Sequence, residues 1–383
     1  MATKVMISCG EASGDLYAAA LASEISRADP DGRVFGLGGD RLAAAGAELV
    51  GHYGGLSVTG LVEALAVVPR AVAMLRRLVA VARSRRPDVL VVIDFPDFNF
   101  RLASAVRRLG IPVVYYVAPQ VWAWRSGRMR AMRRFVQRML VIFPFEETIY
   151  REAGIPVEFV GHPLIDLTET RASRAAVLGA AGLEPTAPTV ALLPGSRPNE
   201  VQRLLGVLVT AAARIAAAQP DAQFVVARAP LLDDALFAPL RRWDGPGRPP
   251  AVIESRTDDV LSSSDVVVTA SGTATVQAAL HERPMVIVYK VSPLTYRIGR
   301  CFLRVDTFGM VNLVAGESIV PELIQERCTP EAIADEVLGY LTDADRAQRT
   351  RARLRAVRAR LGASGASRRA AEAVLAAANS GAA

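Results

Sequence analysis

The chain has 383 residues, enough for two domains of ordinary size. Hydrophobic residues make up 51% of it and charged residues 22%, which excludes a disordered, collagen-like or coiled-coil protein. No stretch reaches the roughly 20 apolar residues needed to span a bilayer, so we expect no transmembrane helix. The first apolar run is followed at once by Glu11 and Asp15, which leaves no room for a signal peptide and predicts a cytoplasmic protein.

The net charge is +7, and arginine carries almost all of the positive charge because the only lysines are Lys4 and Lys290. The distribution of charge says more than its sum. Residues 98–145 contain nine arginines and no acidic residue. A surface this positive predicts attraction to phosphate, anionic lipid or nucleic acid.

Cysteine and histidine are scarce and widely spaced. Three cysteines, Cys9, Cys301 and Cys328, form neither a disulfide framework nor a Cys-x-x-Cys site, and the chain has only three histidines. We therefore expect no metal site and no other cofactor.

Short Val- and Ile-rich runs alternate with longer segments of helical period, the pattern of a parallel sheet covered by helices. In the first half we predict strands at 4–9, 34–37, 89–94, 113–116, 139–143 and 157–160. Residues 164–188 then read as a connection, with a short helix within 171–182. A second series of strands follows at 190–193, 223–227, 251–254, 266–269 and 285–289.

Each series has the size of one doubly wound domain. The fold class is therefore α/β, with two Rossmann-like domains facing a central cleft. Ligands of such sheets bind beyond the carboxyl ends of the strands, so the residues after each strand are the candidates for function. The tail from 345 onward is helical, and a break at 362–365 predicts a separate last helix.

The segment 10–15, Gly-Glu-Ala-Ser-Gly-Asp, follows the first strand and opens a helix. Small residues and free N–H groups at such a turn favour an anion or a hydroxyl-rich ligand. The segment matches neither the dinucleotide-binding nor the P-loop glycine pattern. The alternative is that Ser13 or Asp15 is only a helix cap.

The segment 94–99, Asp-Phe-Pro-Asp-Phe-Asn, lies where a fully apolar strand ends. A carboxylate among Phe95 and Phe98 is poorly solvated, which would raise its pKa and suit a general base. Asp94 is the better candidate because it is nearest to the strand end. The alternative is that Asp94 and Asp97 cap the following helix.

Aromatic residues are densest at 115–125, which contains two tyrosines, two tryptophans and Arg125. They suit stacking on a sugar or base, a membrane interface, or simply a core corner. Residues 56–82 carry a helical apolar stripe flanked by arginines, consisting of Leu65, Val68, Val72, Leu75 and Val79. That stripe fits either a helix lying on an anionic membrane or holding acyl chains, or a buried helix.

In the second half, the turns Gly195-Ser196-Arg197 and Ser271-Gly272-Thr273 both follow strands and lead into helices. Backbone amides, hydroxyls and an arginine fork in this arrangement can hold a diphosphate. The loop 312–325 adds Asn312, Glu322 and Gln325, whose polar groups can bond ribose hydroxyls.

Taken together in chain order, these motifs form a set specific enough to compare with a known family. The set also includes Ala-Pro-Gln-Val-Trp-Ala-Trp-Arg at 118–125, Phe-Pro-Phe-Glu at 143–146, Gly-His-Pro at 161–163, Leu-Pro-Gly-Ser-Arg at 193–197 and Ala-Ser-Gly-Thr-Ala at 270–274. Over nearly its whole length the chain resembles the bacterial lipid-A-disaccharide synthases, which implies the GT-B architecture and metal-independent, inverting glycosyl transfer. The implied substrates are UDP-2,3-diacylglucosamine and 2,3-diacylglucosamine 1-phosphate (lipid X), and the products are UDP and the β-1,6 disaccharide precursor of lipid A.

The resemblance also implies roles for the candidate residues. Asp94 would be the general base, with Asp97, Glu11 and Asp15 shaping the acceptor side. The diphosphate would lie on the two turns of the second half, and the nucleoside on Asn312, Glu322 and Gln325. The apolar stripe of 56–82 and the arginines of 98–145 would face acyl chains and the anionic inner membrane, at its cytoplasmic side.

These roles imply a division of the chain into an acceptor- and membrane-binding domain at 1–165 and a UDP-sugar domain at 166–345. Residues 346–383 would be helices that pack back on an N-terminal domain, of the same subunit or of another, so the protein would be a monomer or a homodimer.

Two rival hypotheses fit parts of the pattern. Another UDP-sugar enzyme, such as a 2-epimerase, would share the fold but has no need of the apolar helix at 56–82. An arginine-rich nucleic-acid-binding protein would explain the charge, but not the two phosphate-type turns or Asp94. We therefore expect no nucleic-acid partner.

Overall fold

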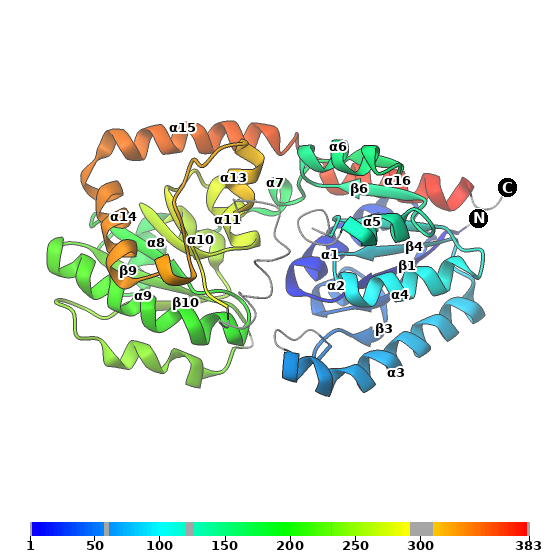
Figure 1. Cartoon of the computed structure of the whole chain (residues 1–383), viewed down its shortest axis with the longest axis horizontal. Coiled ribbons are helices and arrows are strands. Elements are labelled where there is room, and N and C mark those ends of the chain that lie inside the picture. The colour runs from blue at the N-terminus through cyan, green and yellow to red at the C-terminus, as the bar shows by residue number, and fades with distance from the viewer. Residues whose placement is uncertain (1, 57–60, 120–125, 231, 292–308, 381–383) are drawn as a thin grey trace. The chain divides into compact units, whose positions relative to one another are not determined.

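The computed structural model describes residues 2–56, 61–119, 126–230, 232–291 and 309–380. The chain divides into two compact units, coloured along the chain in Figure 1. Unit 1 is Met1–Ile165 together with Leu361–Ala383, and unit 2 is Asp166–Arg360. Each unit contains one parallel sheet with helices packed against it.

Unit 1 has a seven-stranded sheet in the order β3-β2-β1-β4-β5-β6-β7. Its strands are β1 (Lys4–Cys9), β2 (Arg33–Gly38), β3 (Glu48–His52), β4 (Val89–Ile93), β5 (Val113–Tyr116), β6 (Arg138–Val141) and β7 (Val157–Phe159). Its helices are α1 (Ala12–Ala28), α2 (Asp40–Ala44), α3 (Leu61–Arg85), α4 (Pro96–Arg107), α5 (Ser126–Met132), α6 (Pro144–Glu152) and α16 (Ala366–Ser380). The short α7 (Leu164–Leu167) lies where the chain passes from unit 1 to unit 2.

Unit 2 has a six-stranded sheet in the order β10-β9-β8-β11-β12-β13. Its strands are β8 (Thr189–Leu193), β9 (Gln223–Arg228), β10 (Ala251–Glu254), β11 (Val266–Ala270), β12 (Met285–Tyr289) and β13 (Glu322–Ile324). Its α-helices are α8 (Arg174–Ala180), α9 (Pro198–Ala218), α10 (Thr257–Ser262), α11 (Thr273–Leu280), α13 (Met310–Ala315), α14 (Pro330–Thr342) and α15 (Ala344–Arg360), and two 3-10 helices are η2 (Asp234–Arg242) and η3 (Gln325–Arg327).

The eleven strands predicted from the sequence are all present, with ends that shift by at most two residues. Their central members are apolar throughout, as in β4, where all five residues are buried. Strands covered by helices on both faces have this composition. The sequence analysis missed β3 and β13, because both lie at a sheet edge and only their middle residues are buried.

In both sheets the strand order reverses next to the first strand of the unit. β1 lies between β2 and β4, and β8 lies between β9 and β11. Parallel pairing brings the end of β1 beside the end of β4, with Cys9 opposite Ile93. In the same way the end of β8 lies beside that of β11, with Leu193 opposite Thr269. These two switch points are where open α/β sheets bind their ligands.

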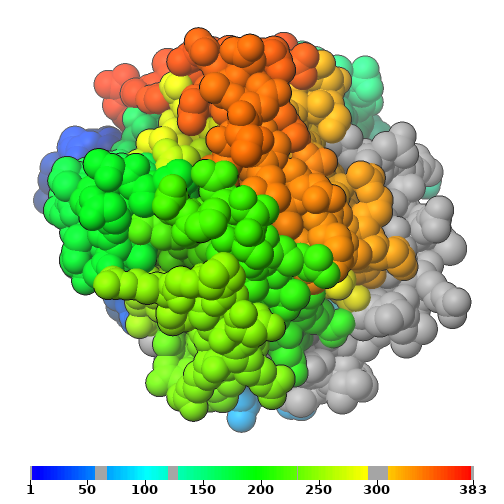
Figure 2. All heavy atoms as spheres, turned by 90° about the vertical axis from the view of Figure 1, so that its left-hand side faces the viewer, coloured from blue at the N-terminus to red at the C-terminus, as the bar shows by residue number. Residues whose placement is uncertain are grey.

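The helical tail is divided between the units. A break after Arg360 separates α15 from α16, as the glycines at 362–365 predicted. The helix α16 packs on α1 of unit 1, but α15 packs on α11, α13 and α14 of unit 2. The expectation that all of 346–383 packs back on an N-terminal domain is therefore wrong for residues 346–360. Figure 2 shows the face of unit 2 on which α14 and α15, in orange, cover its surface next to the green side chains of α9.

Two arginines near the end of α15 explain why it stays with unit 2. Arg358 donates to the carbonyl oxygen of Leu280 at 3.5 Å, and Arg360 donates to those of Val314 and Ala315 at 3.0 and 2.6 Å. These carbonyls end α11 and α13, where free acceptors and the negative end of the helix dipole favour a cation. Part of the arginine excess therefore has a structural use.

Among the described residues, α9 is the one helix long and apolar enough to cross a membrane by length and composition alone. We expected no such stretch. Half of it is buried in unit 2, where Val201, Leu204 and Leu208 lie in the core. Packing against the sheet accounts for the apolar composition of this helix.

His162 of the Gly-His-Pro motif is buried in unit 1. Its ring lies against Tyr17 and Phe143, with centroids 6.1 and 5.2 Å away, and its Nδ1 accepts a hydrogen bond from the N–H of Leu164 at 3.2 Å. Burial lowers the pKa of His162 from 6.5 to about 3. The ring therefore stays neutral in the folded protein at neutral and mildly acidic pH.

This burial makes stability depend on pH. Between pH 6.5 and about 3 the unfolded chain takes up a proton at His162 and the folded chain does not, so the free energy of unfolding should fall by about 1.4 kcal/mol for each pH unit within that range. We predict that urea unfolding at pH 7.5 and 5.5 shows this loss in the wild type and not in His162→Gln, which keeps an acceptor for Leu164. Equal losses in the two proteins would contradict the assignment.

Candidate functional site

The switch point of unit 1 brings two of the predicted motifs together. The turn after β1 begins at Gly10 and the turn after β4 begins at Asp94, and the two strands are paired up to their last residues. The ring of Phe95 lies on Gly10, where a Cβ atom would come within 2.2 Å of it. Only glycine at position 10 allows the second turn to lie this close to the first.

The turn from β4 to α4 has a strained backbone. Asp94 and Phe95 have φ angles of 44° and 47°, in the left-handed region that residues with a side chain seldom adopt. Phe95 also precedes Pro96, and the proline ring restricts its neighbour further. Each such residue costs on the order of 1–3 kcal/mol, and such strain persists mainly where surrounding contacts enforce it. The side chain of Asp94 is half-buried there.

Asn99, in the first turn of α4, is fully buried and bonded on both sides of its amide. Its Nδ2 donates to the carbonyl oxygens of Ser8, Ile93 and Asp94, at 3.2, 3.2 and 2.8 Å. Its Oδ1 accepts a hydrogen bond from the hydroxyl of Ser8 at 2.7 Å. The sequence analysis placed Asn99 in the turn but missed Ser8, whose signal was a hydroxyl inside an otherwise apolar strand.

Two other carboxylates at this switch point, Asp97 and Glu11, differ from Asp94 in their surroundings. Asp97 projects from the first turn of α4, has a side chain 75% exposed, and forms an ion pair with Arg128. Glu11 is half-buried at the N-cap of α1. Of the carboxylates in the segment 94–99, Asp94 is thus the less solvated.

Asp15 is buried and holds a neighbouring turn. It accepts hydrogen bonds from the N–H groups of Gly39, Arg41 and Leu42, at 2.6, 3.1 and 3.3 Å. These groups begin α2, so Asp15 caps that helix from α1 and the negative charge is well placed at its N-terminus. Its carboxylate therefore has a structural use that the expected role on the acceptor side did not foresee.

The aromatic cluster is only partly described. Tyr115 and Tyr116 are fully buried in β5, and Pro119 is buried as well. The hydroxyl of Tyr150 donates to the carbonyl oxygen of Pro119 at 2.7 Å and so fixes the chain after β5. Gln120, Trp122, Trp124 and Arg125 lie outside the described residues.

The switch point of unit 2 also brings two predicted turns together, but the two helix starts differ. Helix α11 begins after Gly272, which has a φ of 150° and open space where a Cβ atom would lie. Within the described part of the chain, the N–H groups of Thr273 and Ala274 have no hydrogen-bond acceptor. This helix start is therefore open to an anion.

The start of α9 is closed by Glu200. Its carboxylate accepts hydrogen bonds from the N–H groups of Ser196 and Arg197, at 3.2 and 3.3 Å, and from the Arg197 guanidinium at 3.1 Å. It also lies against Gly195. The sequence analysis missed Glu200, although its position three residues after Arg197 is that of the acidic member of a capping box.

The three predicted nucleoside contacts lie around β13. Asn312 is buried and all its polar atoms are bonded: its amide nitrogen donates to the carbonyl oxygen of Val320 and to Glu322, and its oxygen accepts from Ile319 and Val320. Glu322 also accepts from the N–H of Gly309 at 3.0 Å. Gln325 pairs with the main chain of Val291 in both directions. These residues thus order the end of the sheet.

The apolar stripe of α3 is partly used by the core. Leu75 and Val79 pack against the buried residues of unit 1, Val72 is half-buried, and Val68 is 49% exposed. The side chain of Leu65 lies outside what the structure describes. A surface cavity of about 280 Å³ opens beside this stripe and is lined by Leu75, Arg76, Val79, Ala80, Arg83 and Ala105.

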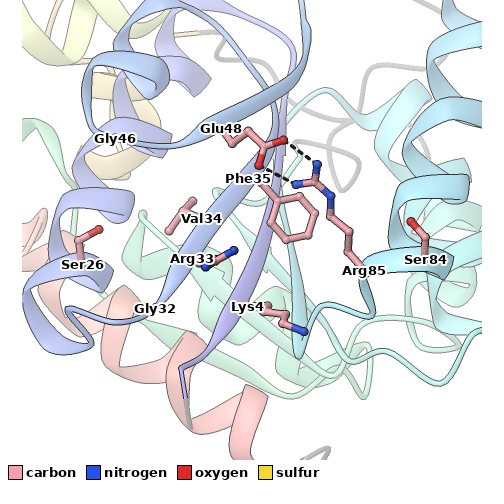
Figure 3. Close-up of a pocket in the computed structure, with 10 residues that line it drawn as sticks. All are labelled: Lys4, Ser26, Gly32, Arg33, Val34, Phe35, Gly46, Glu48, Ser84 and Arg85. Atoms are coloured by element: carbon pink, nitrogen blue, oxygen red, sulfur yellow. Dashed lines mark hydrogen bonds and ion pairs between the residues drawn. The ribbon is translucent and has the colours of Figure 1, made fainter.

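A larger cavity, of about 570 Å³, lies at the amino ends of strands of the unit 1 sheet, away from the switch point (Figure 3). Its wall contains Lys4 and Arg33, at the amino ends of β1 and β2. Arg85 lies over the ring of Phe35 and is held by both carboxylate oxygens of Glu48, at 2.6 and 2.7 Å. Ligands of parallel sheets bind at the other ends of the strands, so we assign this cavity no part in the chemistry.

Among the described residues, no group of three His, Cys, Asp or Glu side chains is placed to hold a metal ion.

The fold and the two switch points define the class of protein. Solved structures that share this fold include the UDP-GlcNAc 2-epimerase of Neisseria meningitidis, with a TM-score of 0.70 and 13% identity over 98% of this chain and 100% of that one. A glycosyltransferase of kitacinnamycin has a TM-score of 0.65 and 19% identity over 98% and 99% of the two chains. The chain has the GT-B architecture, with two parallel α/β domains.

Sequence comparison then separates the members of this class. The family profile of lipid-A-disaccharide synthetase matches residues 5–377, so the chain belongs to this family of glycosyltransferases. The lipid-A-disaccharide synthase of Myxococcus xanthus is 45% identical over 373 residues, 97% of each chain. That of Geobacter metallireducens is 45% identical over 375 residues, 97% of this chain and 96% of the other. The enzyme thus acts in lipid A disaccharide formation and uses a UDP-sugar.

The contacts of Asp15 give a prediction. Asp15→Ala leaves three N–H groups at the start of α2 without this acceptor, two of them buried, so we expect a loss of about 1–3 kcal/mol in the free energy of unfolding. Thermal unfolding compared with Asp31→Ala, an exposed carboxylate of the same unit, measures this effect. A variant that keeps wild-type stability and only raises the KM for the acceptor would show instead that Asp15 acts on substrate.

Proposed function

We propose that the enzyme transfers the 2,3-diacylglucosamine unit of UDP-2,3-diacylglucosamine to the 6-hydroxyl of 2,3-diacylglucosamine 1-phosphate (lipid X). The products are UDP and the β-1,6 disaccharide 1-phosphate, formed with inversion at the donor C1. Membership of the lipid-A-disaccharide synthetase family supports these substrates. The first unit would bind the acceptor and the second the UDP-sugar.

One structural observation carries the assignment of the site. In each unit the predicted polar turns follow the two adjacent strands at which the strand order reverses. The two turns of unit 1 present carboxylates, and the two turns of unit 2 present N–H groups, hydroxyls and an arginine. This contrast suits a base on the acceptor side and a diphosphate on the donor side.

Asp94 is the proposed general base. As the acceptor oxygen attacks C1 of the donor, the proton of the 6-hydroxyl passes to the Asp94 carboxylate. The bond between C1 and the diphosphate oxygen breaks, and UDP leaves with the electron pair. The half-buried position of Asp94 supports this choice over Asp97, whose carboxylate is exposed and paired with Arg128.

The leaving diphosphate would lie at the open start of α11, on the N–H groups after Ser271 and Gly272 and on the hydroxyl of Thr273. The macrodipole of the helix and these donors stabilise the charge that develops as UDP leaves. Arg197 would add its guanidinium. Because Glu200 already occupies the N–H groups of Ser196 and Arg197, we assign the larger share to α11.

For the nucleoside, Glu322 is the proposed ligand of the ribose hydroxyls, and Asn312 would act through it. One oxygen of Glu322 accepts hydrogen bonds from both the N–H of Gly309 and the side-chain amide of Asn312, so the carboxylate is fixed in position. Gln325, bonded to Val291 through both amide atoms, would support the loop next to the nucleoside.

The acyl chains and the membrane would be met by α3. Val68 is exposed, and the cavity beside Leu75 and Val79 has Arg76 and Arg83 in its wall. Apolar groups beside arginines suit a peripheral helix on an anionic leaflet. We therefore propose peripheral binding at the cytoplasmic face of the inner membrane.

The function is tested with purified enzyme in detergent and EDTA, supplied with both acylated substrates. We expect equal amounts of UDP and disaccharide by mass spectrometry. Asp94→Asn should lower kcat by about 10²–10⁴-fold, the usual contribution of a general base, because asparagine cannot take up the proton. Asp97→Asn is the matched control and should stay within about tenfold of the wild type.

Two results would overturn the proposal in different ways. Release of UDP without disaccharide, or turnover only with a soluble acceptor, would refute the substrates. Near-normal turnover of Asp94→Asn together with loss of activity in Asp97→Asn would leave the substrates standing and transfer the role of base to Asp97.

A further inference from the structure

The main-chain carbonyl of Asp94 is held by two side chains from different elements. The hydroxyl of Tyr115, in β5, donates to it at 2.9 Å, and the amide nitrogen of Asn99, in α4, donates to it at 2.8 Å. Both donors are fully buried. The two hydrogen bonds therefore tie the backbone of Asp94 to the neighbouring strand and to the following helix.

Such bonds are needed because the turn is strained. Left to itself, a residue with a φ of 44° would relax toward an extended or right-handed conformation. That rotation would turn the Cα–Cβ bond of Asp94 and move its carboxylate. A carbonyl that is bonded to two fixed donors cannot turn without leaving buried polar groups unpaired, which costs about 1–3 kcal/mol for each group.

The donors are themselves fixed. Ser8 donates its hydroxyl to Oδ1 of Asn99 at 2.7 Å, so the amide is oriented with its NH₂ group toward the carbonyls of Ile93 and Asp94. Burial raises the pKa of Tyr115 well above 10, so its hydroxyl stays a donor over the whole working range. The hold on Asp94 should therefore not vary with pH.

We propose that Tyr115 and Asn99 are positioning residues for the base: they hold the Asp94 backbone in its left-handed conformation and thereby set the direction of its carboxylate. This inference rests on the proposed role of Asp94. Ser8 belongs to the same arrangement, since it fixes the amide of Asn99. None of the three needs to contact substrate to affect turnover.

The test is Tyr115→Phe, which removes one hydroxyl and keeps the ring in the core. We expect kcat to fall by about 10–100-fold, as a misplacement of about 1 Å costs up to 10²-fold, while the KM values for both substrates stay within twofold. Tyr340→Phe, another buried tyrosine whose hydroxyl is hydrogen-bonded to Thr350, is the matched control in unit 2 and should retain wild-type kcat. Ser8→Ala provides a second, independent variant should Tyr115→Phe fail to fold.

A double variant shows whether the effect passes through Asp94. In the Asp94→Asn background, Tyr115→Phe should cause no further fall in kcat, because the carboxylate that Tyr115 positions is replaced by an amide that cannot act as the base. An equal fall in both backgrounds, a loss carried by KM, or wild-type kcat in both Tyr115→Phe and Ser8→Ala would overturn the inference. If Asp94→Asn alone keeps normal turnover, the proposed base is wrong. If Asp94→Asn is inactive while both Tyr115→Phe and Ser8→Ala are normal, only the positioning role is wrong.

Discussion

The arrangement of the unit 1 switch point depends on the contact between Phe95 and Gly10. β1 and β4 are paired to their ends, so the turns that follow them compete for the same space. Glycine at position 10 leaves room for the ring of Phe95, and the chain then enters α4 through two left-handed residues. The polar contacts of Asn99 and Tyr115 hold this arrangement, and its result is a half-buried carboxylate at the end of a rigid strand.

The two units place different side chains at the switch points of their sheets. In both, the polar turns lie where the strand order reverses, a position that the topology of doubly wound sheets leaves open. Unit 1 fills it with carboxylates and uses one of them, Asp15, to cap a helix. Unit 2 fills it with donors, and there Glu200 closes one helix start while the start of α11 stays open. The proposed base and the proposed diphosphate site would thus rest on one architecture with different side chains.

Much of this could be predicted from the sequence, because central parallel strands and their turns have strong local signals. The apolar run 89–93 and the motifs at 10–15 and 94–99 are enough to locate the switch point of unit 1. The edge strands β3 and β13 were missed because short strands with exposed ends have no such signal. The partners of Asp15 and Asn312 are also invisible in a local pattern, since a polar residue beside a turn looks alike whether it binds a ligand or the chain's own N–H groups.

The fold alone does not identify the reaction, since a UDP-GlcNAc 2-epimerase and a glycosyltransferase share it. Family membership narrows the activity to lipid A disaccharide formation.

The most direct measurement is a crystal structure of the Asp94→Asn enzyme with the acceptor, lipid X, and UDP bound. The account predicts that the side chain at position 94 lies within hydrogen-bond distance of the acceptor 6-hydroxyl, about 2.6–3.2 Å, with the backbone still left-handed at positions 94 and 95. A structure in which the 6-hydroxyl is bonded to Asp97 or Glu11, with position 94 turned away from it, would contradict the account.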